Sequence, residues 1–167
     1  MVQIRDLKDY TKVTYENLAS VNDIHPKPHH FLEKGDLLFI AKGMHNFAAH
    51  VDKQLARTVA AANFLVIRVN IENVLPEYLA WCINQGPAQA FLKENAKGSY
   101  IPSISKRVLS ELQIPLPSLE LQQKIIRTQQ LMNLENELIA QIQNRRKIMI
   151  EALLLKTANG GKPNGTR

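Results

Sequence analysis

Cysteine is almost absent from the sequence: Cys82 is the single one among 167 residues, so no disulfide can form within the chain. A chain without disulfides suits a reducing compartment. No apolar run approaches the length of a membrane span. The opening residues, MVQIRDLKDY, are too charged and mixed for a signal peptide. We therefore expect a soluble cytoplasmic protein without membrane attachment.

Motifs of catalytic, cofactor and metal sites are also missing. The sequence has no GxSxG elbow and neither of the glycine-rich phosphate loops, GxGxxG or GxxxxGKS. The five histidines have no cysteine or paired carboxylate at ligand spacing, so we expect no metal site. Cys82 follows Trp81 in an apolar helical segment, which indicates a core residue. We expect a chain that is not an enzyme and binds no cofactor.

Positive charge is present but spread thinly. The formal net charge is +6, and residues 1–117, residues 118–157 and the last ten residues each contribute +2. A basic chain of this kind is compatible with a nucleic-acid partner. Because no region concentrates the charge, composition alone gives this partner only weak support.

The apolar pattern predicts one small α+β domain over residues 1–117, with a twisted sheet flanked by short helices. Short apolar runs bounded by turn residues predict buried strands at Leu37–Ala41 and Phe64–Val69. Pro76 opens a helix, and a second short helix follows over Pro87–Asn95. Both helices carry large apolar side chains, so we expect them to pack on the sheet.

Weaker signals predict the connecting segments of this domain. A short helix is expected around Asp6–Tyr10, and two prolines predict a loop at Asn22–His30. Lys42–Lys53 is polar enough to predict a loop between strands. Ser103 is a suitable cap for a short helix over Ile104–Glu111.

A single long helix is predicted over residues 118–157, ahead of a disordered tail at 158–167. Ser118 is a good N-cap, and no proline or glycine follows until Gly160. The helix carries a coiled-coil type stripe of apolar residues that Arg145 interrupts. The stripe consists of Leu131, Leu134, Leu138, Ile142, Ile148, Met149, Ala152 and Leu155. A small domain cannot cover such a stripe, so we expect a helix of another subunit to cover it.

Two segments have the residue types of a DNA interface. The first is basic and interrupted by a glycine that lets backbone approach a phosphate; it offers Lys97, Gly98, Ser99, Tyr100, Ser103, Lys106 and Arg107. The second carries side chains that read base edges, namely Lys42, His45, Asn46 and His50. A solvated turn between helices explains the first segment equally well, and an ordinary exposed hairpin loop explains the second.

The order of these pieces resembles the specificity subunit of type I restriction-modification systems. The resemblance runs from about Ile4 to Leu155 through GDLLF, FLVIRV, PEYLAWCINQ, GSYIPSIS, IPLPSLELQQKII and KIMIEALL. Its most specific part is Gly98–Ile126. One departure is AKGMHNFAAH, which stands where many members have a stretch rich in glycine and serine.

The resemblance implies a target recognition domain that reads DNA, followed by a helix that docks partners. Members usually hold two such domains and two antiparallel helices, so this chain looks like a half-length form that forms a homodimer and reads a bipartite site. Modification subunits would bring S-adenosylmethionine and methylate adenine, with a restriction subunit as an optional further partner. The loop Lys42–His50 and the segment Lys97–Ser103 match the DNA-facing regions, and Leu119–Leu155 matches the docking helix.

A second function, of a different class, also fits the sequence. The chain could be an adaptor or decoy that captures modification subunits through its long helix and reads no DNA. Sequence preference in DNA binding separates the two hypotheses, because a pure adaptor shows none.

Overall fold

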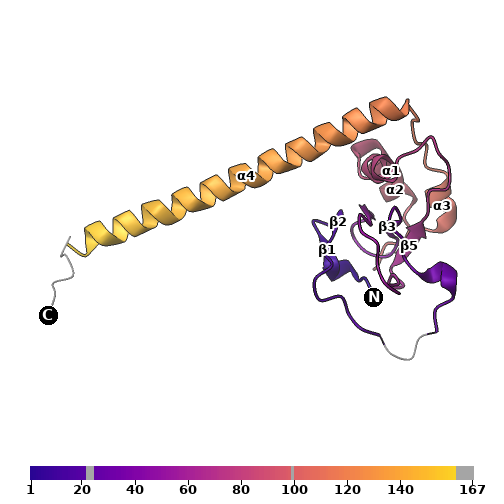
Figure 1. The fold of residues 1–167 in the computed structure, drawn as a ribbon, viewed down its shortest axis with the longest axis horizontal. Helices are drawn as coiled ribbons and strands as arrows, with labels where there is room; N and C mark the ends of the chain where they lie inside the picture. The colour runs from indigo at the N-terminus through magenta and orange to yellow at the C-terminus, as the bar shows by residue number, and fades with distance from the viewer. Residues whose placement is uncertain (22–24, 99, 161–167) are drawn as a thin grey trace. The chain divides into compact units, whose positions relative to one another are not determined.

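The computed structural model describes residues 1–21, 25–98 and 100–160 (Figure 1). Two compact units divide the chain, one of residues 1–126 and one that begins at Arg127. The strands are β1 (Leu7–Lys8), β2 (Lys12–Val13), β3 (Leu37–Ile40), β4 (Ala48–His50) and β5 (Phe64–Ile67). The helices are α1 (Pro76–Ile83), α2 (Gly86–Asn95), α3 (Lys106–Ser110) and α4 (Leu119–Ala158), with 3-10 turns at Ile4–Asp6 and Pro28–His30.

The five strands form one mixed sheet in the order β1-β2-β4-β3-β5, in which only the β2–β4 pair is parallel. β3 pairs with β5 from Leu37↔Ile67 to Ile40↔Phe64. All four residues of β3 are buried, which is the pattern of a central strand covered on both faces. The α+β fold and the two strands predicted from apolar runs are confirmed.

Alternation along β3 divides the core into two clusters, because successive side chains of a strand point to opposite faces. Leu38 and Ile40 pack with residues from the N-terminal part of the chain, such as Val2. Leu37 and Phe39 pack against the helical side of the sheet, where the buried side chains come from α1, α2 and the segment before α3; they include Ile83, Leu92 and Ile104. Cys82 is buried in α1, as predicted for a core residue.

The structure corrects three local predictions. A strand, β4, lies inside the segment predicted as a polar loop, and Asn84 anchors its start: the Asn84 side chain accepts from Ala48 N at 2.8 Å and donates to Ala48 O at 2.8 Å. The predicted helix at Asp6–Tyr10 is instead β1 and a turn. The cap of α3 is Ser105, whose Oγ accepts from Val108 N at 3.2 Å.

The start of α4 is fixed to the first unit. Ser118 Oγ accepts from Leu121 N at 3.4 Å, as expected of an N-cap. One turn further, Gln122 is fully buried; its amide donates to Asn73 O and Pro117 O and accepts from Leu75 N, each at 2.9 Å. The predicted long helix is confirmed. Within the described residues, no helix is both long and apolar enough to cross a bilayer.

Candidate nucleic-acid interface

The end of the sheet where β3 finishes carries several of the predicted site residues. An antiparallel bridge between Lys42 and Ser103 ties the loop that follows β3 to a segment more than fifty residues later in the sequence, and within that segment Ser103 also bridges to Lys97. Gly43 N donates to Pro102 O at 3.0 Å, and Ile104 N donates to Ala41 O at 2.8 Å. The two DNA-like segments of the sequence are therefore neighbours in the fold.

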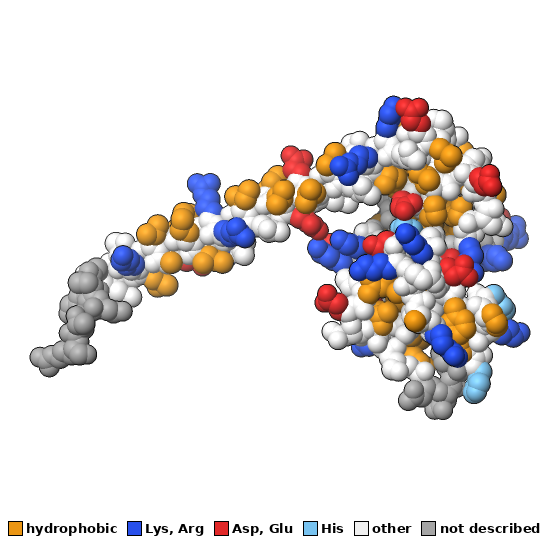
Figure 2. All heavy atoms as spheres, in the orientation of Figure 1, with side chains coloured by type: hydrophobic (Ala, Val, Ile, Leu, Met, Phe, Trp, Pro, Cys, Tyr) orange, Lys and Arg blue, Asp and Glu red, His pale blue; other side chains and the backbone are white. Residues whose placement is uncertain are grey.

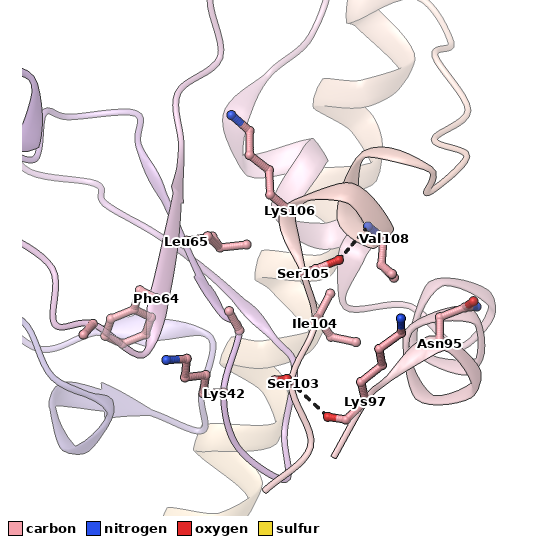
Figure 3. Close-up of a pocket in the computed structure, with 12 residues that line it drawn as sticks. Lys42, Phe64, Leu65, Asn95, Lys97, Ser103, Ile104, Ser105, Lys106 and Val108 are labelled. Atoms are coloured by element: carbon pink, nitrogen blue, oxygen red, sulfur yellow. Dashed lines mark hydrogen bonds between the residues drawn. The ribbon is translucent and has the colours of Figure 1, made fainter.

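A pocket of about 270 Å³ opens at this junction. Figure 3 shows lysines from three separate segments on its walls, Lys42 from the loop after β3, Lys97 from the segment after α2, and Lys106 from the first turn of α3. All three are exposed, and no aspartate or glutamate lines the pocket. Among the described residues, none of the three lysines forms an ion pair. Such a cluster attracts a polyanion, because each ammonium group is free to neutralise a phosphate.

The turn from Lys97 to Ser103 has a firm backbone. Lys97 N and Ser103 N donate to each other's carbonyl groups at 3.0 and 2.8 Å. Gly98 adopts φ +104, and a Cβ there would lie 2.7 Å from Ile101 O, so only glycine fits. Tyr100 at the tip is 91% exposed, whereas Ser99 lies outside the described residues.

Of the residues predicted to read bases, Asn46 is buried and His50 is half-buried. Asn46 is buried; its Nδ2 donates to Ile40 O at 2.9 Å, and its backbone carbonyl accepts from Gln89 Nε2 at 3.0 Å. The Asn46 amide therefore holds the loop in place and is not available to a base. His50 is half-buried at the opposite end of the sheet, paired with Leu37. Residue type selected both, but burial and strand direction depend on tertiary contacts.

The remaining histidine and arginine candidates have defined surroundings. His45 is exposed, and its ring lies 4.6 Å from that of Tyr10, a residue that the sequence did not single out. Arg107 Nε lies 3.1 Å from Oε1 of Glu111, the C-cap residue of α3, so the charge of Arg107 is partly engaged. Burial lowers the pKa of His50, while Glu77, 3.7 Å away, opposes that shift.

Among the described residues, no cluster of His, Cys, Asp and Glu has the composition of a metal site.

The predicted partner residues of α4 are exposed. They are Leu131, Leu134, Leu138, Ile142, Arg145, Ile148, Met149, Ala152 and Leu155. Figure 2 shows apolar side chains recurring along the helix. Ile142 is 64% exposed, and the side chains from Thr128 to Ile142 form an apolar groove on the helix surface. An apolar surface of this extent usually marks a protein interface.

Comparison with known proteins finds a family and relatives that share sequence or fold with this chain. Residues 7–145 match the sequence model of the family described as "Type I restriction modification DNA specificity domain". The type I restriction enzyme HindI specificity subunit of Haemophilus influenzae is 29% identical over 120 residues, which cover 69% of this chain and 26% of that protein. The crystal structure of the HsdS subunit from Thermoanaerobacter tengcongensis superposes with a TM-score of 0.53 and 24% identity, over 81% of this chain and 36% of that one.

The chain thus spans about a quarter of the curated relative that it matches and about a third of the solved one. The likeness to the solved subunit is a likeness of fold alone. The family match extends over most of this chain, through the sheet, the lysine pocket and much of α4. This chain is a member of the type I restriction modification DNA specificity domain family.

Proposed function

We propose that this chain recognises a DNA sequence as the non-catalytic specificity component of a cytoplasmic type I restriction-modification system. The observation that carries the proposal is the meeting of Lys42, Lys97 and Lys106 at one end of the sheet, in a chain of this family. The pocket lysines position the duplex through its phosphates, and neighbouring exposed side chains read the bases. Tyr100 and His45 are exposed in the segments that carry Lys97 and Lys42.

Charge reversal in the pocket tests this proposal. Lys97→Glu and Lys106→Glu should each weaken binding to duplexes of any sequence by about tenfold, because each removes a phosphate partner and adds a repulsive charge. The slope of log affinity against log salt concentration should also fall by about 1 for each phosphate that the variant no longer neutralises. Titration of a random-sequence fluorescent duplex over a salt series measures both quantities.

The matched control is Lys34→Glu, an identical charge change at an exposed position before β3, at the opposite end of that strand from Lys42. Binding by this variant should remain at the wild-type value. Equal losses in all three variants would show that only the net charge of the chain matters, and the pocket would lose its assigned role.

The finer part of the proposal concerns α4. We propose that its exposed apolar stripe pairs with the same helix of a second copy, as a coiled coil, so that two recognition domains read a bipartite site. The exposed apolar side chains between Leu131 and Leu155 support this pairing. Modification subunits that carry S-adenosylmethionine would bind the assembled helices and methylate adenine in the site, and a restriction subunit is an optional further partner.

A further inference from the structure

We propose that Tyr10 and His45 form a second DNA-contacting element, which discriminates base sequence beside the lysine pocket. The inference rests on the proposed function and adds to it a specificity residue, Tyr10. This residue precedes both DNA-like segments by more than thirty positions in the sequence. Four observations carry it: the position of the turn that holds Tyr10, the backbone conformation of that turn, the cluster of rings, and the surrounding charge.

Strand directions place Tyr10 at the lysine end of the sheet. Tyr10 lies in the turn between β1 and β2, directly before β2 begins. β2 runs parallel to β4, with Lys12 paired to His50, so the chain before Lys12 leads back toward the start of β4; the Tyr10 ring lies 6.3 Å from that of Phe47, the residue before β4. The same end carries the loop from β3 to β4, whose first residue after Ala41 is Lys42.

The backbone of this turn is one that tyrosine rarely adopts. Thr11 N donates to Lys8 O at 3.2 Å, and the two residues between, Asp9 and Tyr10, have φ of +51 and +60. A turn with positive φ at both central positions favours Asn-Gly, and a bulky residue there costs about 1 kcal/mol or more. Local conformation therefore disfavours tyrosine at this position, and contacts of the Tyr10 side chain offset this cost.

The Tyr10 ring belongs to a cluster of three rings at the surface. Its centroid lies 4.6 Å from that of His45 and 6.3 Å from that of Phe47, and the His45 and Phe47 rings lie 6.2 Å apart. Phe47 is half-buried at the base, whereas His45 is exposed and Tyr10 is 37% exposed. Within the described residues, the Tyr10 hydroxyl has no hydrogen-bond partner. The cluster therefore presents one hydroxyl and one imidazole to a ligand at this end of the sheet.

Charge and continuity identify the occupant as duplex DNA. Lys8 and Lys12, both exposed, flank the turn, and Asp9 is the one acidic residue in segments 8–12 and 41–47. The loop that holds His45 begins at Lys42 of the pocket, so one short loop joins the ring cluster to the pocket. A basic surface that carries a hydroxyl and an imidazole fits a phosphate backbone and the base edges next to it.

Selection from a pool of random duplexes by the purified full chain, followed by sequencing, gives the preferred sequence. Titrations then compare affinity for that duplex with affinity for a scrambled one. Tyr10→Ala and His45→Ala should each reduce this preference by about tenfold while leaving affinity for the scrambled duplex unchanged, the behaviour of base contacts. Tyr10→Phe keeps the ring and removes only the hydroxyl, so it should lose part of the preference.

The control is Tyr15→Phe, which removes a tyrosine hydroxyl that bonds to Asp52 at the other end of β2 and should leave the preference intact. Thermal unfolding shows whether each variant is folded; if Tyr10→Ala is not, Tyr10→Phe and His45→Ala decide the question. Full preference in folded variants, with weakened binding in Lys97→Glu, would overturn this inference and leave the proposed function standing. Selection of no sequence by the wild-type chain would overturn both.

Discussion

Replacing Gln122 by leucine is expected to lower the free energy of unfolding by about 3 kcal/mol, because leucine leaves three partly buried backbone groups without their hydrogen-bond partner. The amide receives a hydrogen bond from Leu75 N and donates to Asn73 O and Pro117 O. Leucine fills a similar volume but can neither donate nor accept. An unsatisfied buried polar group costs roughly 1–3 kcal/mol, and relaxation of the surrounding backbone recovers part of the sum.

Urea unfolding of the full chain measures this effect, and Gln123→Leu is the matched control. Gln123 is the next residue of α4 and is exposed, so the same substitution there should leave stability almost unchanged. The comparison isolates the effect of the buried amide, since Gln122, unlike Gln123, bonds to the segment before α1. If the two variants unfold at the same urea concentration, the buried amide does not hold the helix start to the first unit.

Combining Leu138→Glu with Ile142→Glu is expected to separate a dimer of the full chain into monomers. The two residues lie one turn apart on the apolar stripe and are 49% and 64% exposed in the single chain. Burying an aliphatic side chain contributes roughly 1.5–3 kcal/mol, and a symmetric pair of helices contains each side chain twice. The dissociation constant should therefore rise by at least about a thousandfold.

Light scattering across a concentration series reports the mass of each form. Asn136→Glu with Gln143→Glu places two acids on the opposite face of α4 and serves as the control, because those positions lie away from the stripe. The control should remain dimeric. A stripe variant that keeps the mass of a dimer would mean that the copies associate elsewhere, and a monomeric wild-type chain would remove the proposed pairing altogether.

The elements that the sequence predicts best depend on local pattern. β3 is a continuous apolar run, LLFI, bounded by turn residues, and α4 is a long segment without proline or glycine. Each can be recognised from neighbouring residues alone. β4 could not be recognised in this way, because three residues carry no period. It forms through pairing with β3 and through hydrogen bonds from Asn84, both of which are long-range contacts.

In the candidate site, the sequence gives the type of each residue but not its position in the fold. The sequence suggests Lys42 and Lys97 as DNA contacts from their type, but it cannot show that both pair with Ser103. His45 and Asn46 are adjacent and equally plausible as base readers, yet the first is exposed and the second is buried. A loop has no fixed period from which to infer which side chain points outward. Tyr10 was missed because its turn joins strands of only two residues each.

Selection of bound duplexes from a random pool by the purified full chain tests the DNA-reading role most directly. If this chain is a specificity component, sequencing should recover one recurrent sequence, and two copies paired through α4 should recover it as two half-sites separated by a fixed interval. Recovery of the pool unchanged, by a chain shown to be folded, would contradict the proposal. The exposed stripe of α4 would then favour an adaptor that binds modification subunits and reads no DNA.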